Sequence, residues 1–167
     1  MMMRSLILFA VLVFAAPTWA QGQQAQPNRV PKDANCFTPK EAEAESEVRT
    51  GIRLREILRR CAAVDPAGKP VLDDWYAFDR ENAARLKQAV ETRQKALDRL
   101  TLQSRLKAQN STDALVATEK PLEVNEGVCK SSYDMVERIK KEKWPGFKYY
   151  ARLQQNLLPE EIPLCRR

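Results

Sequence analysis

The longest regular pattern of apolar and polar positions runs from Leu72 to Ala108, a stretch without glycine or proline. Its apolar residues recur at steps of three and four, which is the period of one helix face. We expect one amphipathic helix here, about 54 Å long and the longest element of the protein. Such a helix would expose its apolar face if it stood alone, so shorter helices must pack along it. The apolar positions are Leu72, Trp75, Tyr76, Ala83, Leu86, Val90, Leu97 and Leu100.

A second helix pattern precedes this stretch. Thr38 can cap it, Pro39 suits the first helical position, and Glu41 stands where a capping box needs a carboxylate. We therefore predict a helix from Pro39 to about Ala62, turning back through the proline-rich residues 65–70 into an antiparallel partner. Asp73 or Asp74 can cap that partner. The buried stripe of the first helix is Ala44, Val48, Gly51, Leu54, Leu58 and Cys61, in which Gly51 would let another backbone approach closely.

The charges of this first helix complement the helix dipole, because four glutamates lie near its positive N-terminal end and four arginines near its negative C-terminal end. Glu45 with Arg49 and Glu56 with Arg60 stand four residues apart, as ion pairs on a helix surface do. We interpret the arginines as a solvated face, and an anion site is the alternative. They are Arg53, Arg55, Arg59 and Arg60.

The C-terminal third of the chain predicts shorter helices. Residues 109–124 are mostly polar and indicate a long connection, in which Asn110 begins a short glycosylation pattern. A third helix is expected from Asn125 to Lys143. Because Trp144 precedes a proline, residues 147–158 form either a fourth helix or a kinked continuation of the third. The fold class is therefore all-α, an antiparallel bundle of three to four helices with one long central helix.

The N-terminal residues resemble an export signal rather than part of the fold. Arg4 precedes an apolar run over residues 6–16, and small residues lead up to Ala20. The run is too short to cross a membrane, which argues against an uncleaved anchor. We predict a signal peptide over residues 1–20 with cleavage after Ala20, a disordered leader over 21–35 and a single helical domain over 36–167. The mature protein would be periplasmic or secreted.

Export determines the interpretation of the four cysteines Cys36, Cys61, Cys129 and Cys165. An even number of widely spaced cysteines in an oxidising compartment predicts two disulfides. Metal binding would need closely spaced ligands, which the chain lacks. A continuous first helix separates Cys36 from Cys61 by about 35 Å, so these two cannot bond. Two pairings remain open: Cys36 with Cys129 plus Cys61 with Cys165, or Cys36 with Cys165 plus Cys61 with Cys129.

Composition argues against several functions. The chain has a formal charge of +6, and without Arg4 its 27 basic and 22 acidic residues leave +5, which by itself does not indicate nucleic-acid binding. There is no histidine and no glycine-rich phosphate loop. The carboxylate pairs Asp73-Asp74 and Glu160-Glu161 suit a helix cap and a tail. We therefore expect no enzyme, no cofactor and no metal site.

Residues 138–152 mix cations with aromatic rings, which suits anionic membrane surfaces, glycans or acidic proteins. The alternative is a helical corner whose rings face the core and whose lysines face water. Trp75 and Tyr76, with Phe78, could likewise form a ligand pocket or simply end a core. The candidate binding residues are Lys140, Lys141, Lys143, Trp144, Lys148, Tyr149, Arg152, Trp75 and Tyr76.

These patterns together predict a small exported protein that binds rather than catalyses. Its expected partner is an envelope protein, for which it would act as a periplasmic accessory subunit, a chaperone-like protein or an inhibitor. The second hypothesis is a binder of anionic lipid headgroups or glycans through residues 138–152. The sequence does not predict the oligomeric state.

Overall fold

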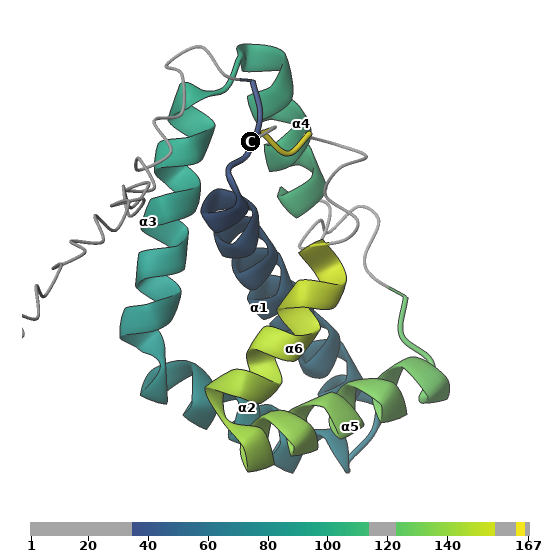
Figure 1. Ribbon diagram of the computed structural model, residues 1–167. Coiled ribbons are helices and arrows are strands. Elements are labelled where there is room, and N and C mark those ends of the chain that lie inside the picture. The colour runs from purple at the N-terminus through teal and green to yellow at the C-terminus, as the bar shows by residue number, and fades with distance from the viewer. Residues whose placement is uncertain (1–34, 114–122, 156–162, 166–167) are drawn as a thin grey trace, which may run out of the picture.

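A computed structural model describes residues 35–113, 123–155 and 163–165 (Figure 1). The predicted signal peptide and nearly all of the predicted leader lie outside these residues. The described part of the chain is all-α and holds six helices, more than the three to four predicted. They are α1 (Pro39–Val64), α2 (Gly68–Glu81), α3 (Ala83–Arg99), α4 (Leu102–Asp113), α5 (Glu126–Glu142) and α6 (Trp144–Gln155).

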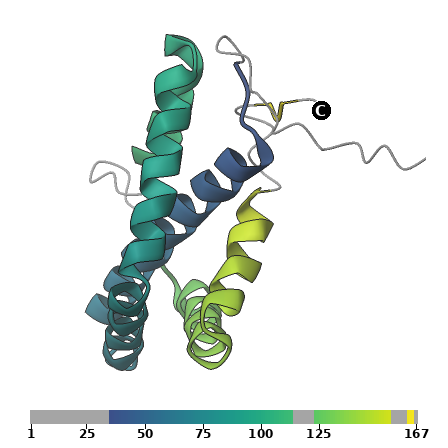
Figure 2. The same ribbon diagram turned by 60° about the vertical axis from the view of Figure 1, so that its left-hand side comes forward.

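The central element is α1, which contacts α2, α3, α5 and α6. In Figures 1 and 2, α1 descends between α3 and α6, which both run upward, while α5 lies across the base beside α2. The antiparallel arrangement therefore holds for α1 against α3 and α6, whereas α5 crosses them. The prediction that Leu72–Ala108 forms the central helix is wrong.

That stretch is divided among three helices, with breaks at Asn82 and Leu100. Asn82 is buried, and its side-chain amide donates a hydrogen bond to the carbonyl oxygen of Phe78 at 3.0 Å. Such local bonds from asparagine compete with regular helix geometry. At Leu100 the backbone is extended, with ψ 156°, and its side chain packs with Phe37. The apolar spacing continues through both breaks, which is why periodicity alone predicts one helix.

Other helix ends also differ from expectation. The second helix begins at Gly68, so Asp73 and Asp74 lie inside it and do not cap it. Helix α4 continues to Asp113, so the predicted connection starts later, and Asn110 of the glycosylation pattern lies on a helix. The first residue after α5 is Lys143, whose φ of 58° separates α5 from α6. The two are therefore distinct helices, and Pro145 lies in the first turn of α6, where a proline costs no hydrogen bond.

Two clusters of buried apolar side chains form the main core. One lies at the upper end of α1 and consists of Phe37, Ala42, Ala96, Leu97, Leu100 and Ala108. The other lies at the base, where α1, α2, α5 and α6 meet, and consists of Leu54, Leu58, Trp75, Phe78, Val136, Ile139 and Phe147.

The disulfides join Cys36 to Cys165 and Cys61 to Cys129, with Cα distances of 5.0 and 5.6 Å. This is one of the two pairings that the sequence leaves open. The first ties the C-terminus to the start of α1, and the second ties the end of α1 to the start of α5. Two disulfides indicate an oxidising location outside the cytoplasm.

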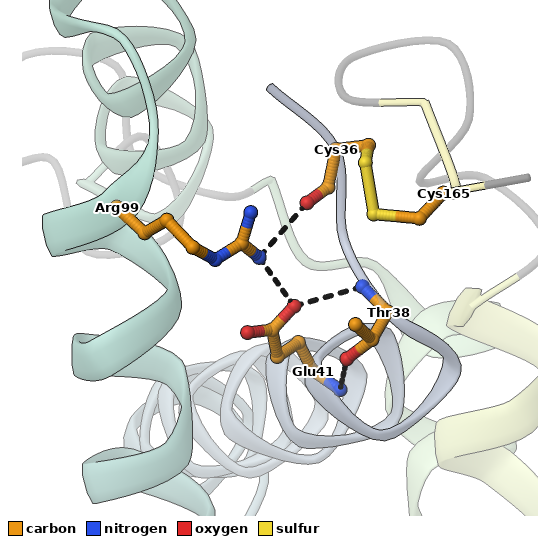
Figure 3. Close-up of a disulfide and its surroundings, with 5 residues drawn as sticks. All are labelled: Cys36, Thr38, Glu41, Arg99 and Cys165. Carbon is orange, nitrogen blue, oxygen red and sulfur yellow. Dashed lines mark hydrogen bonds and ion pairs between the residues drawn. A yellow bond between two sulfur atoms is a disulfide. The ribbon is translucent and has the colours of Figure 1, made fainter. Parts of the chain in front are cut away.

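The start of α1 is held from two sides (Figure 3). The predicted capping box is present: Glu41 accepts from the Thr38 amide at 2.8 Å, and the Thr38 hydroxyl accepts from the Glu41 amide at 3.3 Å. From α3, Arg99 donates to the Glu41 carboxylate at 2.6 Å and to the carbonyl oxygen of Cys36 at 3.0 Å. The cap, the disulfide and α3 are therefore one connected unit.

Gly51 on α1 does not serve a close helix approach, contrary to expectation. A Cβ built at this buried position would meet no heavy atom within 4 Å outside its own helix turn. At Gly68, in contrast, a Cβ would lie 2.9 Å from the Ala62 nitrogen and would press on the hydroxyl of Tyr133.

We therefore expect Gly51→Ala to raise the free energy of unfolding by about 0.5–1 kcal/mol, because glycine weakens a helix interior and the added methyl group meets free space. Gly68→Ala, the matched control, should lower it. Urea unfolding followed by circular dichroism measures both. A less stable Gly51→Ala variant would contradict the free space beside Gly51.

Candidate functional site

Most cations of residues 138–152 form ion pairs within the protein. Lys140 pairs with Asp74 at 2.8 Å, and Lys143 lies 3.9 Å from Glu81. Both contacts join the end of α5 to α2. The side chains of Lys141 and Arg152 are exposed, and no carboxylate lies within 4.0 Å of either among the described residues.

The aromatic members of the stretch divide between core and surface. Trp144 is half-buried, and the centroid of its ring lies 6.3 Å from that of Phe78. Both rings belong to the base cluster, which also contains the fully buried Trp75. Tyr76 packs half-buried against the same core. Tyr149 is exposed, and the Arg138 guanidinium lies 4.0 Å from its ring centroid. The structure thus brings Trp75, Tyr76 and Trp144 together as the end of a core.

Lys148 on α6 reaches across to α1. Its ammonium group pairs with Glu43 and, at 2.6 Å, with Glu47. Burial lowers the pKa of Lys148, but the two carboxylates outweigh this effect, and the net pKa lies above the ordinary value for lysine. This candidate binding residue therefore fastens α6 to α1.

A buried ion pair fastens α3 to the opposite side of α1. The side chain of Glu45 is 0% exposed and accepts from Arg49 at 2.7 Å and from Arg93 of α3 at 2.6 Å. Arg93 also donates to the Thr112 hydroxyl of α4 at 2.9 Å. A buried carboxylate of this kind needs such partners, because its removal from water is costly.

Alternate glutamates on α1 thus point to different neighbours. Glu41 and Glu45 bind arginines of α3, whereas Glu43 and Glu47 bind Lys148 of α6. Sequence reasoning identified the Glu45–Arg49 pair but missed these links between helices. The spacing of two residues was a visible signal, since it sends successive side chains to different faces, but it does not reveal which distant cation each carboxylate meets.

The structure also holds a groove that sequence reasoning missed. It lies between α1, α5 and α6 and encloses about 430 Å³, a volume within the usual range of binding pockets. We call it the α1–α5–α6 groove. Among the described residues, the apolar lining is Leu54, Ile57, Val128, Met135, Tyr150 and Leu153, and the polar lining is Thr50, Arg53, Asn125, Gly127, Ser131 and Gln154.

Two features suggest that this groove receives a ligand. Leu153 is 49% exposed although it is large and apolar, and it stands at the rim on α6. Thr50 is 6% exposed, and its hydroxyl oxygen has no hydrogen-bond partner in the described structure. Native proteins pair nearly all buried polar groups, so an unpaired hydroxyl at the wall of a groove calls for an explanation.

Two smaller hollows are less suited to binding. One of about 280 Å³ lies between α1, α3 and the start of α6 and is mainly polar, and its carboxylates Glu43 and Glu47 already bind Lys148. The other, of about 170 Å³, lies between α2 and α5 under the ion pair of Asp74 with Lys140.

Within residues 35–113, 123–155 and 163–165, no three potential ligand side chains lie together in a way that could hold a metal ion. No helix among these residues is long and apolar enough to cross a membrane. Asp74 of the first carboxylate pair is bound to Lys140, and the second pair, Glu160-Glu161, lies outside the described residues.

Compared with known protein families, curated proteins and solved structures, the chain shows no significant match.

The buried pair predicts a clear stability effect. Glu45→Gln removes the charge that compensates Arg49 and Arg93, so the free energy of unfolding should fall by about 3 kcal/mol. Glu91→Gln is the matched control, because the side chain of Glu91 is 56% exposed and lies 3.9 Å from Lys87, and it should cost less than about 0.5 kcal/mol. Equal effects in urea unfolding would contradict the structural role of Glu45.

Proposed function

We propose that this protein acts outside the cytoplasm by binding an apolar segment of a partner protein in the α1–α5–α6 groove. The observation that carries the proposal is the groove itself, which combines a volume of about 430 Å³ with apolar walls and an exposed leucine at its rim. Grooves between helices that present apolar side chains commonly receive peptide segments.

The walls of the groove are fixed relative to one another. The Cys61–Cys129 disulfide ties α1 to α5, and Lys148 ties α6 to Glu43 and Glu47 of α1. A preformed groove loses little conformational freedom on binding, which favours affinity. The arrangement therefore supports a binding function, whether the protein serves as an accessory subunit, a chaperone-like protein or an inhibitor.

The alternative, binding of anionic lipid headgroups or glycans by residues 138–152, receives less support. Lys140, Lys143 and Lys148 face carboxylates of the same chain, and an anionic surface would have to compete with these contacts. Lys141 and Arg152 remain as exposed cations. Two such charges give only weak attraction, because each basic residue near an anionic surface contributes about 1 kcal/mol.

A selection from random peptides displayed on phage tests the groove. We expect the disulfide-bonded protein to enrich peptides with a shared apolar motif. Leu153→Glu should weaken binding of a selected peptide about tenfold or more, because it removes apolar contact area and places a charge at the rim. Fluorescence anisotropy with the labelled peptide gives the dissociation constants.

Val90→Glu is the matched control, since Val90 is 52% exposed on α3 and does not line the groove. It should leave binding unchanged. The proposal would be contradicted if both variants weakened peptide binding equally, or if the unaltered protein enriched no peptides.

A further inference from the structure

We infer that the segment bound in the α1–α5–α6 groove carries a carboxylate beside its apolar side chains, and that this carboxylate lies against Arg53. The inference rests on the proposed function and specifies the chemistry of the partner. It follows from the charges of the groove, from an unpaired hydroxyl in its wall and from the helix that begins at its edge.

Among the residues that the structure describes, Arg53 is the one charged residue that lines the groove, and no carboxylate lines it. Arg53 is exposed on α1, and no carboxylate lies within 4.0 Å of it in the described part of the chain. The other arginines of α1 all pair with a carboxylate: Arg49 with Glu45, Arg55 with Asp79, and Arg59 and Arg60 with Glu56. Arg53 is therefore the one arginine of α1 that forms no ion pair with a described residue, and it lines the groove.

Thr50 stands three residues before Arg53, so both side chains lie on the same face of α1. Its hydroxyl is buried and unpaired at the wall of the groove. A buried hydroxyl without a partner costs stability, and a ligand oxygen that accepts a hydrogen bond from it would remove that cost. The pair thus offers a hydroxyl donor beside a guanidinium, a combination that suits a carboxylate.

The N-terminus of α5 adds to the positive character of the same groove. Asn125 and Gly127 line it, and the first turn of a helix carries partial positive charge on its N–H groups. Gly127 has no side chain to keep a ligand from this turn. Glu123 and Glu126 are exposed nearby in the sequence, but neither lines the groove. An acidic, apolar segment therefore matches the groove better than a basic or an uncharged one.

The same peptide selection tests for the carboxylate, because the enriched peptides can be aligned and compared position by position. Peptides enriched by the unaltered protein should carry Asp or Glu at a fixed place next to the apolar motif. Replacing that acid by its amide in a selected peptide should weaken binding about fivefold, as expected for a partly exposed ion pair, and the loss should shrink as salt is raised.

The corresponding change in the protein is Arg53→Gln, which should weaken binding of the acidic peptide to the same extent and make its amide form bind no worse than its acid form. Arg53→Glu should shift the selected motif from acidic to basic residues. Arg80→Gln is the matched control, because Arg80 is exposed on α2 and does not line the groove. Its binding should equal that of the unaltered protein.

Each remaining outcome is decisive. An apolar motif without a fixed acid, or an acid effect that persists in Arg53→Gln, overturns this inference while the proposed function stands. Absence of any enriched motif overturns both. A dimer in sedimentation equilibrium that Leu153→Glu dissociates would show that a second copy fills the groove, and this too overturns the inference.

Discussion

A carboxylate without access to water needs cations at hydrogen-bonding distance, and the side chain of Glu45 is such a group. One of its partners, Arg49, lies on the same helix, but the other, Arg93, must come from α3. The fold therefore has to place α3 against this face of α1. On the next face of α1, the carboxylate of Glu47 is 9% exposed and pairs with Lys148 of α6, which also binds the more exposed Glu43. Helix α1 is central because its carboxylates require neighbours on two sides.

These ion pairs and the disulfides have complementary effects. Ion pairs specify which faces of α1 meet α3 and α6, while Cys61–Cys129 holds the start of α5 to the end of α1. These contacts hold the helices at defined positions, and the α1–α5–α6 groove lies between them. Its apolar lining and unpaired Thr50 hydroxyl are consequences of this geometry. The proposed binding function depends on these constraints, since a groove whose walls moved freely would lose affinity on ordering.

Local signals in the sequence predicted local structure well. The capping box at Thr38, the start of a helix near Asn125 and the exclusion of a bond between Cys36 and Cys61 are confirmed, because each depends on residues close in sequence or on the length of one helix. The breaks at Asn82 and Leu100 could not be predicted, since the apolar period continues through them. The groove and the partners of the α1 glutamates could not be predicted either, because both depend on how distant helices pack.

Site-specific photo-crosslinking in cells that produce the protein can detect a partner protein bound in the α1–α5–α6 groove. A photoreactive phenylalanine analogue would replace Leu153 at the rim of the groove or, as the control, the equally exposed Val90 of α3. We expect a discrete crosslinked product from position 153 and none from position 90. A product from position 90 alone, or none from either position, would contradict it.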